Sequence, residues 1–396
     1  EILDVMSKQA EILPFAYGGT VDNEPKQILA SKLQDWAPPG MGETKTLFSS
    51  SGTEANEGAI RLAYQYHWER GNETKSKIIG RWQSYHGNTA GALAISGRTS
   101  WRKKHDLLLP DVPHIPPPYC YRCPWGLSYP GCALVCADEL RRVISQEGPE
   151  NIAAFIVEPI VGTSMSGVVP PPEYYGLIRE ICDQYDVLLI VDEVMTGIGR
   201  TGKKWGIDHW GVTPDIITSS KGISGGYAPL GAVILGEKVW KPIQGGSGEV
   251  TYGSTYGGNP LSCAVGVAVL NYIETHNLVE RAGSMGEKLL SAFHDKLADL
   301  PNVGDIRGKG LLLGVELVLD KKTKETFPTE WNVSHRIEME ARNYGLIILA
   351  GVSGLVDGAS GDHVEIAPPY IIDDDHVEFI ASNVKRSIEN VVGSLR

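Results

Sequence analysis

Four short apolar runs in the middle of the chain limit the possible fold more than any other feature of the sequence. They are Ala153–Val157 (AAFIV), Val187–Val191 (VLLIV), Asp215–Thr218 (DIIT) and Gly231–Leu235 (GAVIL). Their apolar residues are continuous and do not alternate with polar ones, as expected of strands covered on both faces of a parallel sheet. Helical patterns lie between and around them, so the central part of the chain is predicted to be a doubly wound α/β domain.

The chain has 396 residues, which is enough for one large domain and a smaller one. After Pro260 the pattern changes. Apolar residues at helical spacing predict a helix over 285–300 and a last helix over 377–391, which begins at the acidic run 373–375. Apolar runs at 311–317 and 345–349 are predicted to be strands. A smaller α+β domain is therefore expected at the C-terminal end.

The segment Val187–Gly206 (VLLIVDEVMTGIGRTGKKWG) contains two nucleotide-binding patterns, GxGxxG and GxxxxGK. A dinucleotide-binding turn requires the strand to lead directly into the first glycine and a helix to begin at the third. Here polar residues from Asp192 onward separate the strand from Gly197, and no helical pattern follows. A phosphate loop requires Ser or Thr after its lysine, but Lys204 occupies that position. Neither NAD nor ATP binding is therefore predicted.

Two charged residues at strand ends indicate a different chemistry. Asp192 ends one buried strand and Lys221 follows the next, at the sheet edge where α/β proteins bind ligands. A buried carboxylate needs a cation. One interpretation is pyridoxal 5′-phosphate, bound to Lys221 as a Schiff base, with its ring nitrogen kept protonated by Asp192. The other is a plain Asp–Lys salt bridge, and these two residues alone leave both interpretations open.

Two further segments could contribute to such a site. Ser51, Gly52 and Thr53 precede a helical pattern, and free N–H groups and hydroxyls at a helix N-terminus can bind a phosphate. The alternative is that Ser51 only caps the helix. Tyr85, in SYHG, could stack on a pyridine ring, although a single aromatic residue at a strand end is more often part of a core.

Taken together, eight motifs resemble the class III, or omega-type, pyridoxal-phosphate aminotransferases, in order and over nearly the whole chain. They are SGTEANE (51–57), YHG (85–87), VEPIVG (157–162), DEVMTGIGRTG (192–202), SSKGISGGYAPLGA (219–232), STYGGNPLSCA (254–264), RGKGLLLGVEL (307–317) and EIAPPY (365–370). The resemblance implies a fold-type I enzyme with a large PLP-binding domain over 23–270 and a small C-terminal domain over 271–396. Residues 1–22 are expected to belong to the small domain, with the family's usual first stretch missing before Glu1.

The resemblance also implies roles for individual residues. Lys221 would form the Schiff base and carry the proton between the cofactor and the substrate carbon, while Asp192 would pair with the ring nitrogen. The ring would lie between Val194 and Tyr85. Other cofactor-binding residues implied by the motifs are Ser51, Gly52, Thr53, His86 and Glu158. Thr255 would reach the phosphate of a neighbouring subunit, which implies a homodimer with shared active sites, or a tetramer built from such dimers.

Two departures from the family pattern concern the substrate. Many members carry an Arg where this chain has Glu365, and use it to hold a substrate carboxylate. They often carry a Glu where this chain has Thr163. We therefore expect a donor that is an amine or omega-amino compound, and a keto acid or aldehyde acceptor; Met195 also fits this amine-directed branch. Arg200 and Arg61 are candidate second cations for a keto acid.

The composition argues against other kinds of partner. A net charge of −12 disfavours nucleic acid binding, which needs a basic face. No apolar run approaches the roughly 20 residues of a membrane span, and no signal peptide opens the sequence, so no membrane association and a cytoplasmic protein are expected.

Four of the six cysteines cluster in the sequence as CxxC followed by CxxxC, at Cys120, Cys123, Cys132 and Cys136. Such pairs can bind zinc or an iron–sulfur cluster. No histidine lies nearby at the spacing of a zinc finger, so reduced thiols in a Pro-rich loop are the favoured interpretation and no metal is predicted.

Other activities remain open at this point. The same fold and cofactor also support decarboxylases, racemases and phospholyases. A catalytically silent dimer retained for binding is disfavoured because it would be expected to have lost Lys221 or Asp192, and both are present.

Overall fold

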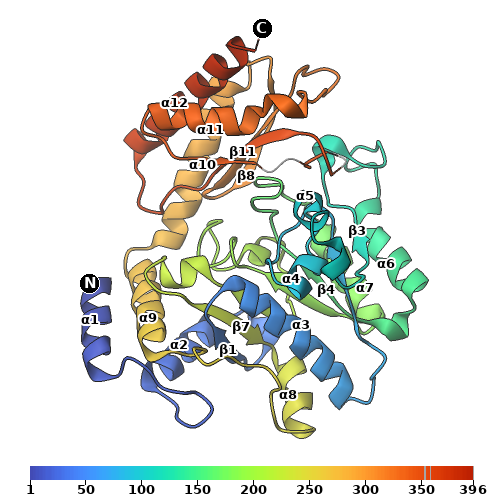
Figure 1. Ribbon diagram of the computed structural model, residues 1–396, viewed down its shortest axis with the longest axis vertical. Coiled ribbons are helices and arrows are strands. Elements are labelled where there is room, and N and C mark those ends of the chain that lie inside the picture. Colours follow the sequence, from blue (N-terminus) through green and yellow to red (C-terminus); the bar gives the residue numbers. More distant parts are fainter. Residues whose placement is uncertain (352–353, 357, 396) are drawn as a thin grey trace.

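A computed structural model describes residues 1–351, 354–356 and 358–395 of the chain. The helices and strands form two parts, each built on one sheet (Figure 1). The larger part holds a seven-stranded sheet, and the smaller part, coloured orange to red, holds a four-stranded sheet. The predicted combination of a large α/β domain and a small C-terminal α+β domain is confirmed.

The larger sheet has the strand order β1-β7-β6-β5-β4-β2-β3. Its strands are β1 (Lys45–Ser49), β2 (Lys77–Arg81), β3 (His114–Ile115), β4 (Ile152–Val157), β5 (Leu188–Asp192), β6 (Ile216–Ser219) and β7 (Gly231–Leu235). The four strands expected from the apolar runs are β4 to β7, and every residue in them is buried.

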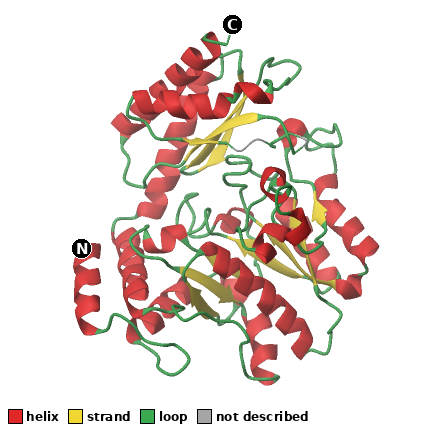
Figure 2. Cartoon of the chain, in the orientation of Figure 1, coloured by secondary structure: helices red, strands yellow, loops and turns green. Residues whose placement is uncertain are grey.

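Helices cover both faces of this sheet (Figure 2). In β4, Phe155 and Val157 pack into a core with residues of α2, α6, α7 and α9. Ala154 and Ile156 face the other way and pack with residues of α3 and α8. Because successive side chains of a strand point to opposite faces, a strand covered on both sides needs apolar residues at every position.

The helices of the larger part are α1 (Ile2–Ile12), α2 (Glu24–Trp36), α3 (Gly52–Glu69), α4 (Ala90–Ile95), α5 (Thr99–Arg102), α6 (Val135–Glu147), α7 (Tyr174–Gln184), α8 (Glu237–Gly245) and α9 (Pro260–Thr275). The smaller part consists of α10 (Leu278–Leu297), β8 (Val303–Lys309), β9 (Leu312–Leu317), α11 (Val333–Asn343), β10 (Leu349–Ala350), β11 (Asp362–Ile366) and α12 (Asp374–Gly393). Its antiparallel sheet has the order β10-β11-β9-β8.

One strand departs from the predicted parallel arrangement. β2 to β6 pair in parallel, but β7 runs antiparallel to both β6 and β1. The connection from Ser219 to Gly231 is short and contains only a single 3-10 turn over Lys221–Ser224. A parallel crossover usually carries a helix across the face of the sheet, and this connection has none and returns the chain in the opposite direction. A continuous apolar run in the sequence indicates that both faces of a strand are buried, but it does not indicate the direction in which the strand runs.

The N-terminal segment also differs from the expectation. The assignment of residues 1–22 to the small domain is wrong for α1, because Ile2 and Met6 pack against the core of the larger part. Figure 1 shows α1 alongside α9. The core of the larger part extends to Leu278, and that of the smaller part begins at Ala282, so the two cores meet within the first turn of α10.

In the smaller part, the last helix is confirmed as α12. Asp373 caps it by accepting a hydrogen bond from the His376 amide at 3.0 Å, which satisfies one of the free N–H groups at its start. The strand predicted at 345–349 is wrong in its bounds, because only Leu349 and Ala350 pair with β11. The residues before them follow the C-terminus of α11, and Leu346 and Ile348 are buried without joining the sheet. Their apolar character therefore reflects core packing.

Within the described residues, no helix is both long and apolar enough to cross a membrane. The cytoplasmic location stays a sequence-based prediction.

Candidate active site

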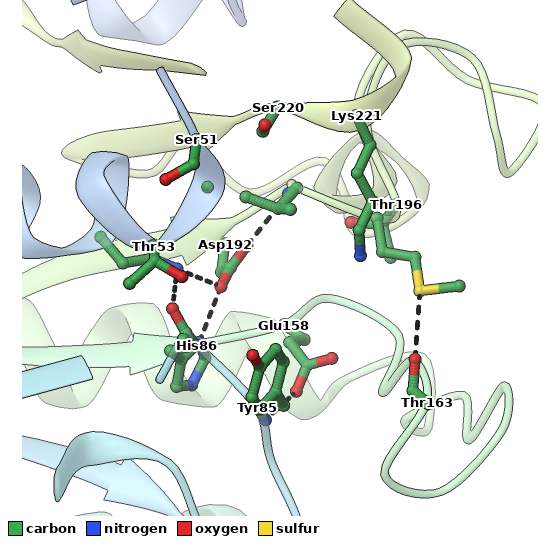
Figure 3. A pocket seen from close by; sticks show the side chains of 15 residues that line it. Ser51, Thr53, Tyr85, His86, Glu158, Thr163, Asp192, Thr196, Ser220 and Lys221 are labelled. Carbon is green, nitrogen blue, oxygen red and sulfur yellow. Dashed lines mark hydrogen bonds and ion pairs between the residues drawn. The ribbon is translucent and has the colours of Figure 1, made fainter. Parts of the chain in front are cut away.

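A cavity of about 190 Å³ lies where the carboxyl ends of β4, β5 and β6 meet the N-terminus of α3. Figure 3 shows the side chains that converge on it. Its lining includes ten residues predicted from the sequence as cofactor or substrate contacts, namely Ser51, Gly52, Thr53, Tyr85, His86, Glu158, Thr163, Asp192, Val194 and Lys221. The fold thus brings together side chains that are up to 170 positions apart in the sequence (221 − 51 = 170).

Asp192 is held at the end of β5 by three hydrogen bonds. Its Oδ2 accepts from Asn56 Nδ2 at 2.7 Å and lies 2.8 Å from His86 Nδ1, while its Oδ1 accepts from the Val194 amide at 3.0 Å. The side chain is only 4% exposed. Three donors satisfy the oxygens of this buried carboxylate and fix its direction toward the cavity. No salt bridge joins it to Lys221 among the described residues, so the alternative of an Asp–Lys pair is not the arrangement found.

Lys221 follows β6 and is the first residue of the 3-10 turn over Lys221–Ser224. Its φ is +45°, a left-handed conformation that is unfavourable for a residue with a side chain. Figure 3 shows the side chain directed into the cavity, and the residue is exposed. The backbone conformation therefore aims a lysine amine at the space beside Asp192.

The N-terminus of α3 faces the same space. Ser51 caps the helix, since its side chain accepts a hydrogen bond from the Glu54 amide at 3.2 Å. In the described part of the chain, the amides of Gly52 and Thr53 donate to no protein acceptor. A Cβ on Gly52 would lie 2.8 Å from a Val194 methyl carbon, so the close approach of these two segments requires glycine. Free N–H groups at a helix start bind anions such as phosphate. The SGT segment therefore caps the helix and also leaves two amides free of protein acceptors in the described part of the chain.

Tyr85 and Glu158 form the opposite wall. Glu158 is 6% exposed, and its carboxylate accepts hydrogen bonds from the Tyr85 and Gly162 amides, both at 2.9 Å. Burial raises the pKa of the Glu158 carboxyl, and the Asp192 charge acts in the same direction. The first of these bonds holds the Tyr85 backbone beside the cavity, and Tyr85 lines the cavity, so it is not simply part of a core.

The two residues expected to affect the substrate occupy different positions. Thr163 lines the cavity and lies 3.8 Å from the Met195 sulfur. Glu365 comes from β11 of the smaller part, where it pairs with Gly314 of β9. It is 3% exposed, and its Oε2 has no hydrogen-bond partner in the described residues. Burial raises the pKa of Glu365 to about 7, although the nearby charge of Lys221 lowers it.

The two arginines named as candidate second cations do not line the cavity. Arg200 donates to the carbonyls of Leu311 and Pro368 at 3.1 and 2.6 Å and stacks on the Tyr370 ring, so it joins the two parts of the molecule. Arg61 is exposed on α3 and lies in a separate hollow. The sequence could not decide between a structural and a ligand-binding role for either residue.

Asn56 is a site residue that the sequence analysis missed. Besides Asp192, its Nδ2 donates to the His86 carbonyl at 2.7 Å, and its Oδ1 accepts from Thr218 Oγ1 at 2.7 Å. It is 1% exposed. Its position beside Ala55 and Ala59 on the inward face of the helix could have identified it, because a buried amide needs polar partners.

Thr255 lies outside this cavity. It lines a second hollow, together with Tyr17, Lys26 and Tyr252. Its expected contact with the phosphate of a neighbouring subunit stays a prediction.

The cysteine loop contains Cys120, Cys123, Cys132 and Cys136 as free thiols. Burial raises the pKa of the Cys136 thiol to about 12. No group of three or more His, Cys, Asp or Glu side chains in the described ranges has an arrangement that could hold a metal ion. Elemental analysis of the purified protein is the direct test for a metal.

The sequence model of the family described as Aminotransferase class-III matches residues 1–388. Among curated proteins, the uncharacterized aminotransferase YodT of Bacillus subtilis is 36% identical over 396 residues, covering 100% of this chain and 88% of YodT. Adenosylmethionine-8-amino-7-oxononanoate aminotransferase of Geobacter sulfurreducens is 34% identical, covering 99% of this chain and 85% of that protein.

Among solved structures, the thermostable (S)-enantioselective omega-transaminase from Thermomicrobium roseum aligns with a TM-score of 0.91 at 34% identity. The alignment covers 99% of this chain and 85% of that structure. The likeness therefore extends over both parts of the molecule.

Proposed function

The chain belongs to the class III aminotransferases, and from this premise we propose that its cavity binds pyridoxal 5′-phosphate and transfers an amino group from an amine or omega-amino donor to a keto acid or aldehyde. The placement of Lys221 and Asp192 in one cavity, at the ends of neighbouring strands, carries the proposal. The family membership supports the transaminase activity, and the side chains present support the cofactor.

The residues of the cavity fit the chemical groups of this cofactor one by one. The free amides of Gly52 and Thr53 at the start of α3 suit its phosphate. The Asp192 carboxylate suits a protonated ring nitrogen, and Val194 and Tyr85 offer apolar and aromatic surfaces for the two ring faces. The amine of Lys221 suits the aldehyde carbon.

When bound, the cofactor would supply an electron sink that stabilises negative charge on the substrate carbon. The protein then has to hold that carbon, move a proton and admit the second substrate in a ping-pong sequence. Lys221 Nζ is the group placed to take the proton from the substrate carbon and return it at the cofactor carbon. Asp192 is held in position by donors from Asn56, His86 and the Val194 amide.

The donor class follows from Glu365. A carboxylate that is almost completely buried and lacks a partner for Oε2 repels a substrate carboxylate and favours a cationic amine. Thr163 in the cavity supplies no charge that would offset this preference. We therefore place amines and omega-amino compounds ahead of α-amino acids as donors.

The assembly belongs to the same proposal. Thr255 lies in a hollow apart from its own cavity, which suits a residue that completes the site of a second copy. We propose a homodimer in which each subunit contributes Thr255 to the phosphate site of the other.

The visible absorption spectrum of the reconstituted protein tests the cofactor and the donor class together. We expect a yellow band that is absent in Lys221→Ala and that amines or omega-amino acids bleach without any acceptor. A band that no amine changes would leave the cofactor but favour decarboxylation, racemisation or phospholyase chemistry. No band after reconstitution would refute the cofactor assignment.

The donor preference has a separate test at Glu365. Arg or Ala at this position should raise the rate with α-amino acids relative to amines, because the buried negative charge is gone. Glu389→Ala, an exposed glutamate of α12, serves as the matched control. An unchanged ranking of donors in Glu365→Arg would refute the role of Glu365.

A further inference from the structure

Arg98 is a buried cation whose side chain has no hydrogen bond and no ion pair in the described part of the chain. Its side chain is 8% exposed, and it makes no hydrogen bond and no ion pair within the described residues. Its Nε is buried and has no hydrogen-bond partner. Burial lowers the pKa of Arg98, yet a guanidinium remains protonated in proteins at any physiological pH. Buried charges are normally paired, so an unpaired buried guanidinium indicates that an anionic ligand pairs with it.

Aromatic rings hold the Arg98 guanidinium beside the cavity. Its central carbon lies 4.2 Å from the centroid of the Trp101 ring and 5.5 Å from that of Tyr85, and the two rings meet edge to face. Tyr85 itself lines the cavity. A guanidinium that stacks on rings keeps its N–H groups free in its own plane, which is the edge that binds a carboxylate through two parallel hydrogen bonds.

The nearest acidic residues do not neutralise Arg98. Glu158 and Glu365 are close enough for their charges to act on it, but neither forms an ion pair with it. Glu158 already accepts hydrogen bonds from the Tyr85 and Gly162 amides. Within the described residues, no protein anion therefore pairs with the guanidinium, which lies next to Tyr85 of the cavity wall.

We infer that Arg98 binds the carboxylate of the amino acceptor, which is therefore a keto acid. The inference rests on the proposed aminotransferase function and narrows its acceptor from keto acid or aldehyde to keto acid. It also separates the two substrates by charge, since a cationic donor is favoured by Glu365 and an anionic acceptor by Arg98. Arg98 contacts Tyr85 of the cavity wall, and the charges of Glu365 and Lys221 act on each other, so donor and acceptor can use the same cavity in turn.

The test compares two acceptors of equal carbon number, pyruvate and propanal, with the same amine donor. In Arg98→Leu, we expect the ratio of kcat/KM for pyruvate to that for propanal to fall about 100-fold, the usual size of a lost charged hydrogen-bond pair. Arg98→Lys should recover part of the ratio, because it keeps the charge but loses the second parallel bond. Arg142→Leu, at an exposed arginine of α6, is the matched control and should leave the ratio unchanged.

If Arg98 only packs against Tyr85 and Trp101, its replacement should lower kcat/KM for both acceptors by the same factor. An unchanged ratio in Arg98→Leu would overturn the inference.

Binding without turnover gives a second readout. Calorimetric titration of pyruvate into cofactor-reconstituted Lys221→Ala protein should show binding that weakens about 100-fold when Arg98→Leu is added. Equal affinity in the two proteins would refute the role of Arg98. This titration still decides about Arg98 if no amine reacts with the wild-type protein, a result that would count against the proposed function alone.

Discussion

At the scale of single residues, the site depends on how two buried carboxylates are hydrogen-bonded. Asp192 is surrounded by donors, whereas Glu365 is buried with one oxygen unpaired in the described residues. The difference arises from hydrogen bonding, because both side chains are almost fully buried. Asp192 therefore suits a positive group of a bound cofactor, and Glu365 suits a cationic substrate that binds and leaves.

Glu365 should make the stability of the protein depend on pH. Its pKa in the folded state is about 7, above the ordinary value of 4.5, so the folded state binds the proton more tightly than the unfolded state. The contribution of Glu365 to the free energy of unfolding is therefore fully present below pH 4.5. Up to about 3 kcal/mol of this contribution is lost as the pH rises through 7. In Glu365→Gln, the free energy of unfolding should exceed that of the wild type by about this amount at pH 8 and by little at pH 5.

Urea unfolding at pH 5, 6.5 and 8 measures this difference. Glu389→Gln provides the control, since this glutamate is exposed. A constant difference between Glu365→Gln and the wild type at all three pH values would contradict the predicted titration.

Asn56 is expected to matter for cofactor retention. In Asn56→Ala, Asp192 loses one donor and Thr218 loses its acceptor. We expect cofactor affinity to fall about 10-fold and stability by about 1–3 kcal/mol, because buried groups are left unsatisfied. Absorbance during dialysis reports the loss of cofactor. Asn343→Ala, at an exposed residue of α11, should change neither quantity.

At the scale of elements, the ends of helices and strands create the site. β4, β5 and β6 are parallel, so Glu158, Asp192 and Lys221 follow their carboxyl ends at one edge of the sheet. α3 starts at the same edge and directs its free amides there. The reversed strand β7 keeps the connection from β6 short, and this tight turn sets the conformation of Lys221.

The two roles of the start of α3, helix capping and phosphate binding, should be separable by mutation. Ser51→Ala and Asp373→Ala each remove a capping side chain, from α3 and α12 respectively. Each should lower stability by about 1 kcal/mol. Only Ser51→Ala should also weaken cofactor binding, because α12 does not reach the cavity. Thermal unfolding and cofactor titration of both variants test this; equal cofactor affinity in the two would contradict a phosphate site at α3.

At the scale of the whole molecule, the small domain brings a further buried carboxylate close to the residues of the large domain. Glu365 comes from β11, and the Arg200 side chain ties the two parts together through the carbonyls of Leu311 and Pro368. Rigid attachment of this kind keeps Glu365 within reach of the charges of Lys221 and Arg98.

Shared sites in a dimer would make two inactive variants complement each other. Lys221→Ala and Thr255→Asp should each be nearly inactive alone, the second because a negative charge faces the phosphate. After mixing and subunit exchange, heterodimers contain one site with both original residues, so about a quarter of the wild-type activity should return. Lack of any recovery, in samples where mass spectrometry shows heterodimers, would contradict the role of Thr255 across the interface.

Several features could be predicted from the sequence because they depend on local patterns. Continuous apolar runs identified the buried strands β4 to β7, and the acidic run at 373–375 marked the start of α12. Asp192 and Lys221 could be selected because a charged residue at the end of a buried strand costs free energy unless it has a partner.

Other features depended on contacts that no local pattern records. The direction of β7, the attachment of α1 to α9 and the roles of Asn56 and Arg98 follow from which segments meet in space. Arg98 shows the difference most clearly, since an arginine in a loop is unremarkable until its burial and its missing partner are known. The sequence alone determined the fold class, because continuous apolar runs and helical spacing are local patterns, and it indicated Lys221 and Asp192 as candidate site residues. Only the tertiary structure decided strand direction and charge pairing, because these arise between residues far apart in the chain.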